Sequence, residues 1–413
     1  MFLVPNGPVV AMVGGGQLAR MTHQAAIALG QGLRVLAERA DDPAAQVSPD
    51  VVIGSHTDIE ALRQVAAGAD ALTFDHEHVP TDLLHILVAE GVAVLPPPEA
   101  LVCAQDKLVM RRRLSELGAP VPRFTAVDSL VDVDAFAARV GGAVVVKTVR
   151  GGYDGRGVVL CDDLAAASDA VTGYLAAGVP VLLEERVSMR RELAVLVARS
   201  PFGQGASWPV VETVQREGIC VTVLAPAPGL CEDLGAHAEQ LGLRIAEELG
   251  VVGVLAVELF ETSDGELLVN ELAMRPHNSG HWTMNGSVTS QFEQHLRAVL
   301  DYPLGDTRAI APVTVMANVL GAAQTPAMGM DERLHHLFGR IPEAHVHLYG
   351  KAERPGRKIG HVNVVGSDLD TVRERAERAA HWLSHAHWTD GWGTDGWRAG
   401  NDAERSDEEE RRK

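Results

Sequence analysis

Short β-branched apolar runs alternate with longer segments rich in Ala and Leu along the first hundred residues. The pattern predicts strands at 9–13 and 33–37, with a helix between them at 17–29. Two further apolar runs, at 51–53 and 71–74, continue the same rhythm. Because parallel strands need a crossover between them, this alternation indicates a parallel α/β sheet.

A different pattern begins after the proline-rich segment 95–98, which we take as the first domain boundary. A helix is expected at about 105–117, because Gly118 and Pro120 follow it as stop signals. The strands expected beyond it lie at 143–147, 158–160, 181–184, 193–198, 251–260 and 267–271. Several of them are separated only by turns, so this region is expected to be α+β with antiparallel pairing.

The remaining chain divides into a third, smaller unit after Tyr302 and a charged end. The segment from 401 to 413 is almost entirely charged and is expected to be a solvated tail. The domains expected are therefore 1–104, 105–305 with a lid at about 120–188, 306–388, and a tail at 389–413.

Composition narrows the class of protein. The chain has 413 residues and a formal net charge of −19, which argues against binding nucleic acid or anionic lipid. Its four cysteines lie far apart, so neither a zinc ribbon nor a disulfide framework is expected, and a reducing, cytoplasmic compartment fits best. The uncharged run 309–330 contains Pro312 and Pro326, so we read it as a buried strand plus a loop and expect no membrane span.

The first candidate site is the glycine-rich turn at 14–19, between the first strand and its helix. It fits the G-x-G-x-x-A pattern of dinucleotide-binding folds, and Glu38 lies near the position of a ribose-binding acid. Taken alone, the pattern suggests NAD. A tight turn before a helix N-terminus could equally approach a phosphorylated substrate, or be a turn without a ligand.

A second glycine-rich loop, at 151–157, joins the strands expected at 143–147 and 158–160. Its spacing does not match a Walker P-loop. The backbone donors of such a loop can cover phosphates, and Lys147 on the incoming strand supplies a positive charge. A plain surface hairpin would need fewer glycines.

Two carboxylates form the third candidate. If the last hairpin closes on a two-residue loop at Asp264 and Gly265, Glu258 and Glu271 lie directly opposite each other on one face. Opposed carboxylates repel unless a proton or cation lies between them. Mg²⁺ bound to nucleotide phosphates is the natural partner, with Asn270 beside it, although a solvated acidic face would look the same.

A basic cluster at 351–358 stands out in this acidic chain. It contains Lys351, Arg354, Arg357 and Lys358. Such a cluster is typical of an anion site, although a charged loop that balances nearby acids is the alternative.

Taken together, these motifs resemble the N5-carboxyaminoimidazole ribonucleotide synthetase family over about residues 8–385. The segments that carry the resemblance are Gly-Gly-Gly-Gln-Leu-Ala-Arg-Met at 14–21, Thr-Phe-Asp-His-Glu-His-Val-Pro at 73–80, Gln-Asp-Lys at 105–107, Gly-Gly-Tyr-Asp-Gly-Arg-Gly at 151–157, Asn-Glu at 270–271 and Arg-Pro-His-Asn-Ser-Gly-His at 275–281. The resemblance implies an ATP-grasp fold with an N-terminal Rossmann-like domain and a small C-terminal domain. It also implies a homodimer that uses ATP, Mg²⁺, aminoimidazole ribonucleotide and bicarbonate.

The resemblance further implies roles for individual residues. ATP contacts are expected from Lys107, Lys147, Gly152, Tyr153, Asp154, Gly155, Arg156, Gly157, Val158, Glu184, Glu185, Arg186, Val187, Glu192, Gln215, Asn270 and Glu271. The metal ligands would be Glu258 and Glu271. The residues expected at the reacting groups are Tyr153, Asp154, Arg156, Arg275 and His277. The ribonucleotide would contact Gln17, Leu18, Glu77, Lys351, Arg357 and Lys358.

The chain departs from the family pattern at three positions. The family often has Asn at Gly15 and Gly at Ala19, and His in place of Gln215. The alanine still permits close helix packing, whereas the glutamine removes an imidazole from the ATP site. A neighbouring ATP-grasp ligase, such as one that acts on glycinamide ribonucleotide with formate, is the alternative function.

Overall fold

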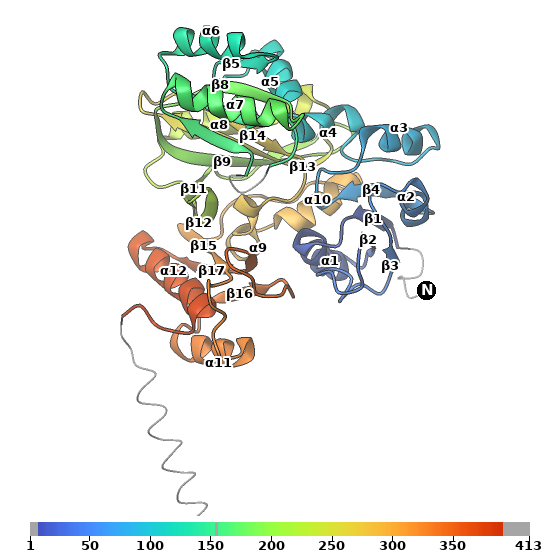
Figure 1. The fold of residues 1–413 in the computed structure, drawn as a ribbon. Helices are drawn as coiled ribbons and strands as arrows, with labels where there is room; N and C mark the ends of the chain where they lie inside the picture. Colours follow the sequence, from blue (N-terminus) through green and yellow to red (C-terminus); the bar gives the residue numbers. More distant parts are fainter. Residues whose placement is uncertain (1–6, 153–155, 391–413) are drawn as a thin grey trace, which may run out of the picture.

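The computed structural model describes residues 7–152 and 156–390. Within these ranges the strands form three sheets, one in the N-terminal domain, one in the lid, and one large sheet that runs through the rest of the molecule (Figure 1). The mixed α/β and α+β architecture agrees with the sequence-based expectation.

The N-terminal domain contains a four-stranded parallel sheet in the order β3-β2-β1-β4. The strands are β1 (Val9–Val13), β2 (Gly32–Ala37), β3 (Val51–Ile53) and β4 (Ala71–Phe74). The helices are α1 (Gln17–Leu29), α2 (Ile59–Ala66) and α3 (Thr81–Ala89). The prediction of a parallel sheet is confirmed, because each apolar run pairs through a crossover connection.

The helix expected at 105–117 is present as α5 (Lys107–Glu116), and a helix that was not expected, α4 (Pro98–Gln105), precedes it. They are separated at Asp106, whose carboxylate accepts a hydrogen bond from the backbone N–H of Val109 at 2.9 Å and caps α5. The prediction missed α4 because the prolines were read as breakers. Pro98 instead begins a helix, where a missing N–H costs nothing.

The lid is an antiparallel sheet in the order β5-β8-β6-β7, against which two helices pack. The strands are β5 (Phe124–Val127), β6 (Val144–Thr148), β7 (Val158–Cys161) and β8 (Val181–Glu185). The helices are α6 (Leu130–Val140) and α7 (Leu164–Ala176). The hairpin predicted around the second glycine loop is therefore present as β6 and β7.

The large sheet has the order β14-β13-β9-β11-β12-β15-β17-β16, and β10 pairs with β9. Its first strands are β9 (Met189–Arg199), β10 (Gly205–Ser207), β11 (Val211–Arg216), β12 (Ile219–Ala225), β13 (Gly253–Thr262) and β14 (Leu267–Ala273). Helix α8 (Glu232–Glu248) packs on β9. The connection after β14 contains a 3-10 turn at Asn278–Gly280, then α9 (Thr283–Gly286) and α10 (Gln291–Val299).

The C-terminal strands extend this same sheet. They are β15 (Val313–Leu320), β16 (His345–Leu348) and β17 (Lys358–Gly366), and the helices with them are α11 (Met330–Arg340) and α12 (Leu369–His385). Because β15 pairs with β12, the third unit shares its sheet with the middle of the molecule. The periodicity of the sequence did not reveal this continuity.

The uncharged run at 309–330 is the buried strand β15 followed by a loop, as predicted. Among the described residues, no helix is long and apolar enough to cross a membrane. Trp388, the last residue of the expected third unit, stacks on Trp382 with ring centroids 4.3 Å apart. Asp390, at the start of the expected tail, pairs with Arg340.

Candidate functional site

Glu258 on β13 lies directly opposite Glu271 on β14, so the predicted opposition of these carboxylates is confirmed. The reasoning about the turn was wrong. Residues 262–266 separate the paired ends of the strands, and one extra residue in β14, Asn270, shifts the register back so that the two glutamates face each other. A bulge at this position also turns Asn270 toward the lid.

Negative charge gathers around Glu258. Burial, and then the carboxylates of Glu271 and Glu192, raise the pKa of Glu258 to about 8, whereas Lys358 and Arg275 act in the opposite direction. Glu271 is held by Lys107, whose Nζ lies 2.8 Å from Oε1. Clustered carboxylates that share one position fit a hard cation.

The carboxylates do not complete a metal site by themselves. In the part of the chain that is described, no group of three or more His, Cys, Asp or Glu side chains is arranged to hold a metal ion. A cation between Glu258 and Glu271 would therefore need further oxygen ligands from a bound molecule, such as phosphate groups.

A second cluster lies where the lid meets the large sheet. Lys147 on β6 is buried, and its Nζ donates to Glu184 Oε2 at 2.8 Å and to Asn270 Oδ1 at 3.1 Å. Glu184 also accepts from Arg111 Nε at 2.7 Å. The resemblance implied that Glu184 contacts ATP, and in the structure its side chain is a buried partner of two cations. The sequence analysis did not select Arg111, although its spacing pointed to it: the residue lies one helical turn after Lys107 and so shares its helix face.

Glu192 on β9 lies within reach of the same cluster. Burial raises its pKa, and the opposing influences are a hydrogen bond from Gln215 and the charge of Lys147. Gln215, where the resemblance led us to expect a histidine, is therefore a neutral hydrogen-bond partner of the Glu192 carboxylate.

The glycine-rich loop leaves β6 above this cluster. Gly152 and Gly157 have φ values of +83° and +73°, and a Cβ atom on them would lie 2.4 Å from the carbonyl oxygen of Arg156 and 2.5 Å from Thr148 Oγ1. Only glycine fits both conditions. Arg156 is exposed, and Tyr153, Asp154 and Gly155 lie outside the described residues.

Other lid residues are not brought into the cluster by their side chains. Glu185 accepts hydrogen bonds from the backbone N–H and Nε of Arg123, at 2.7 and 2.6 Å, and Arg186 pairs with Asp162. Val158 begins β7, and Val187 follows β8. Any nucleotide contacts from these four residues would therefore come chiefly from the backbone or from apolar surface.

An ion pair joins the acidic pair to the N-terminal domain. Arg275 Nε lies 2.9 Å from Glu77 Oε2, which brings together residues 198 positions apart. The ring of His277 contacts the acidic pair, with Nε2 3.4 Å from Glu258 Oε1, and its Nδ1 lies 2.9 Å from Ser279 Oγ. Burial, and then the charges of Arg275 and Lys358, lower the pKa of His277 to about 3, so the imidazole is neutral at pH 7.

Asp75, which sequence reasoning did not select, occupies the first glycine turn. Its carboxylate accepts a hydrogen bond from the backbone N–H of Gly16 at 2.5 Å, and a Cβ on Gly14 would lie only 1.6 Å from Asp75 Oδ1. Burial raises the pKa of Asp75 to about 6, whereas the Gly16 N–H and the charge of Arg275 lower it. Because a carboxylate already faces this helix N-terminus, the turn is poorly suited to a dinucleotide phosphate. The sequence could have indicated Asp75 as a site residue, because it directly follows β4, at the edge of the sheet where the carboxyl ends of the strands lie.

The basic segment reaches the same region from the C-terminal domain. Lys351 donates a hydrogen bond from Nζ to the side chain of Gln17 at the start of α1. Lys358 lies at the start of β17 and acts electrostatically on Glu258 and His277. Arg357 donates to the backbone of its own loop, and the Leu18 side chain is part of a buried apolar cluster.

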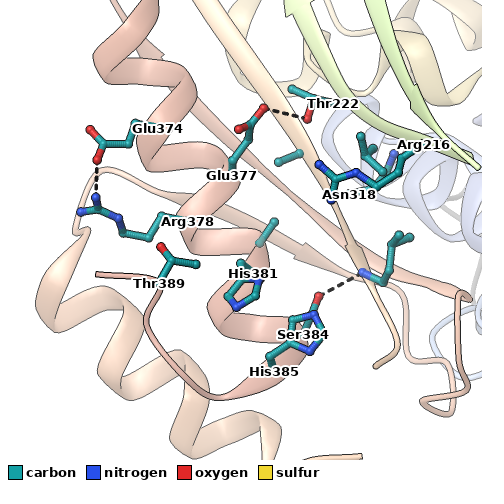
Figure 2. A pocket seen from close by; sticks show the side chains of 14 residues that line it. Arg216, Thr222, Asn318, Glu374, Glu377, Arg378, His381, Ser384, His385 and Thr389 are labelled. Atoms are coloured by element: carbon teal, nitrogen blue, oxygen red, sulfur yellow. Dashed lines mark hydrogen bonds and ion pairs between the residues drawn. The ribbon is translucent and has the colours of Figure 1, made fainter. Parts of the chain in front are cut away.

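A separate cavity of about 400 Å³ lies on another part of the molecule, where α12 faces β12 and β15 (Figure 2). Its lining includes Arg216, Thr222, Glu377 and His381, none of which belongs to the clusters above. Thr222 Oγ1 lies 3.2 Å from Glu377 Oε1 across it. The candidate site is therefore the junction of the acidic pair, the lysine cluster and the Arg275–Glu77 bridge, rather than this cavity.

Three family models of known proteins match consecutive parts of the chain. Family models match for the ribonucleotide synthetase preATP-grasp domain at residues 8–105, the ATP-grasp domain at 112–292, and the phosphoribosylaminoimidazole carboxylase C-terminal domain at 314–375. The chain is 70% identical to the N5-carboxyaminoimidazole ribonucleotide synthase of Mycobacterium tuberculosis H37Rv, over 98% of this chain and 96% of the relative. It is 52% identical to that of Corynebacterium ammoniagenes, over 94% and 95%.

Solved structures are similar along nearly their whole length. An N5-carboxyaminoimidazole ribonucleotide synthetase solved as an ADP complex is 32% identical, with a TM-score of 0.84 over 92% of this chain and 98% of that one. The synthase of Aspergillus clavatus, solved with ADP and 5-aminoimidazole ribonucleotide, is 30% identical, with a TM-score of 0.81 over 92% and 99%.

Proposed function

Because this chain belongs to the N5-carboxyaminoimidazole ribonucleotide synthetase family and is an ATP-dependent ligase of purine biosynthesis, we propose that it joins a carboxyl group from bicarbonate to the amine of 5-aminoimidazole ribonucleotide. ADP and phosphate are the other products. The observation that carries this proposal is the convergence of the opposed glutamates, the Lys147 cluster and the Arg275–Glu77 bridge at one junction of the domains.

The nucleotide side of this junction consists of positive charge next to paired carboxylates. Lys107 and Lys147 bind the phosphates of ATP, Gly152 and Gly157 let the loop close over them, and Glu192 holds the ribose hydroxyls with Gln215 beside it. Glu258 and Glu271 hold Mg²⁺, whose charge, once bound, offsets that of the transferring phosphoryl group. Lys107 then exchanges its contact with Glu271 for a contact with phosphate.

The reaction takes place in two steps. An oxygen of bicarbonate attacks the γ-phosphorus of ATP, the bond to the ADP oxygen breaks, and carboxyphosphate forms. The amine of the ribonucleotide then attacks the carbonyl carbon, the bond from that carbon to the phosphate oxygen breaks, and the nitrogen gives up a proton. Arg275 faces the developing negative charge, and the imidazole of His277, neutral at pH 7, lies beside Glu258 as a polar contact for the reacting groups.

The ribonucleotide binds between the N-terminal domain and the basic segment. Lys351, Arg357 and Lys358 bind its 5′-phosphate, and Gln17, the Leu18 backbone and Glu77 orient the remainder. The resemblance assigns Tyr153, Asp154 and Arg156 of the glycine-rich loop to the aminoimidazole and bicarbonate. The contact of Lys351 with Gln17 supports this placement, because it brings the basic segment to the first turn of α1.

The experiment that tests the function is ADP release with Mg-ATP, aminoimidazole ribonucleotide and bicarbonate, beside controls that each omit one component. ADP release that requires both substrates supports the proposal. ADP release that continues without either one contradicts it, and formate in place of bicarbonate, with glycinamide ribonucleotide, tests the alternative ligase.

We also propose that the enzyme is a cytoplasmic homodimer. All four cysteines are free thiols, which agrees with a reducing compartment. Light scattering on the protein as it elutes from a size-exclusion column tests the dimer. A mass near 44 kDa, which is the mass of one chain, would contradict it.

A further inference from the structure

Arg111 is a buried cation to which none of the roles above is assigned. It lies on α5, and its side chain is 0% exposed. Its Nε donates to Glu184 Oε1 at 2.7 Å, and its Nη2 donates to the backbone carbonyl of Asn270 at 2.8 Å. Burying a guanidinium lowers the stability of the fold unless hydrogen bonds and opposite charges replace its lost hydration. Its position therefore needs an explanation.

The contacts of Arg111 form a closed ring with the Lys147 cluster. Arg111 and Lys147 each bind one oxygen of Glu184, and each also binds Asn270, one at the carbonyl and the other at the side-chain oxygen. Burial would raise the pKa of Glu184, but Lys147 and Arg111 hold it below its usual value, so the carboxylate stays ionised.

The charge of this ring explains why it needs two cations. Lys147 and Glu184 alone would form a neutral pair, in which the carboxylate competes with a phosphate for the ammonium group. With Arg111 added, two positive charges face one negative charge, and the ring keeps a net charge of +1. Arg111 Nη1 is buried and makes no hydrogen bond within the described residues, which agrees with positive charge in excess.

We propose that Arg111 is a positioning residue for ATP, which satisfies the charge of Glu184 so that Lys147 remains available to the phosphates. This inference rests on the proposed role of Lys147. The planar guanidinium is suited to the task, since one side chain spans the Glu184 carboxylate and the Asn270 carbonyl, whereas a lysine offers a single point charge.

The test uses compensating charge changes. Arg111→Gln leaves a neutral Lys147–Glu184 pair, so we expect the dissociation constant of Mg-ATP to rise roughly tenfold, the loss of one charge-assisted interaction. The double variant Arg111→Gln with Glu184→Gln restores the net charge of +1, and we expect its affinity to return to within about threefold of wild type. Arg113→Gln is the matched control. This exposed arginine of the same helix pairs with Glu116, so its replacement should change the affinity less than twofold.

Affinity is measured by calorimetry and folding by thermal unfolding of each variant. A folded Arg111→Gln variant with wild-type affinity overturns the proposal, and so does a folded double variant that binds no better than the single one. If Arg111→Gln does not fold, Arg111→Met, which also removes the charge but keeps an unbranched side chain, replaces it, alone and with Glu184→Gln, and the same recovery is required. Because Mg-ATP binding needs neither the ribonucleotide nor bicarbonate, a failure of the proposed carboxylation is seen separately in the ADP-release assay.

Discussion

Glu258→Gln should stabilise the protein free of metal and nucleotide while it abolishes turnover. The pKa of Glu258 is raised from 4.5 to about 8, chiefly by burial and then by Glu271. In the folded chain the carboxyl therefore keeps its proton at pH values where the unfolded chain has lost it. The stability from this proton is complete below pH 4.5 and is lost as the pH rises through about 8.

The size of the effect follows from the same shift. A rise of the Glu258 pKa from 4.5 to about 8 corresponds to a loss of about 5 kcal/mol in the free energy of unfolding once the carboxyl is fully ionised. Because 28% of the Glu258 side chain is exposed, screening by water reduces the expected gain from Glu258→Gln to roughly 2–3 kcal/mol above pH 8. At pH 5, where Glu258 is protonated in the folded protein, the gain should be close to zero.

The assay is thermal unfolding from pH 5 to pH 9 without Mg²⁺ or ATP. Relative to wild type, the midpoint of Glu258→Gln should rise by several degrees between these limits. Glu266→Gln, which removes an exposed carboxylate from the same hairpin, should run parallel to wild type. In the ADP-release assay, Glu258→Gln should lose about 100-fold or more of its turnover.

The reasoning is refuted if the Glu258→Gln and wild-type midpoints stay parallel across this pH range. It is also refuted if turnover persists near the wild-type level, because the opposed carboxylates would then have no role with a metal. Restored turnover in Glu258→Asp would show that the carboxylate, rather than its exact reach, is needed.

Three other changes test separate parts of the structure. Gly14→Ala places a methyl group against Asp75 at a φ of +113°, so the free energy of unfolding in urea should fall by at least about 3 kcal/mol. Gly30→Ala is the control: its φ is +65°, but the space around it is open, so its free energy of unfolding should fall by only about 1 kcal/mol. Equal losses in the two variants would contradict the clash with Asp75. Lys351→Met should raise the KM for aminoimidazole ribonucleotide roughly tenfold and leave that for ATP within about twofold; a matching rise for ATP would exclude the assigned phosphate contact. Trp388→Ala removes a buried stacked ring, so the free energy of unfolding should fall by about 3 kcal/mol. An unchanged midpoint of thermal or urea unfolding would mean that this ring does not stabilise the fold.

Much of the local structure could be predicted from the sequence. The helix at 17–29 and the strands at 9–13 and 51–53 lie where the apolar pattern places them. Helix and strand periods are properties of neighbouring residues, so they can be read from a short window. The opposition of Glu258 and Glu271 was predicted from a two-residue turn that the structure does not contain, and the bulge at Asn270 is what restores their register.

The site depended on contacts that no window contains. Asp75 at the first glycine turn, the pairing of Arg275 with Glu77, and the ring around Arg111 join segments 59 to 198 positions apart. Their partners are chosen by burial, because a charge removed from water must find an opposite charge or a hydrogen bond in whatever part of the fold surrounds it.

By itself, then, the sequence determined the elements, the glycines that allow close backbone approach, and the residue types that could bind phosphate and metal. Only the tertiary structure decided that β15 extends the central sheet, that a bulge sets the register of the acidic pair, and that Glu184 serves two cations. The physical reason is that secondary structure follows from the local period of the chain, whereas the protonation and partners of a buried charge follow from the groups that packing brings around it.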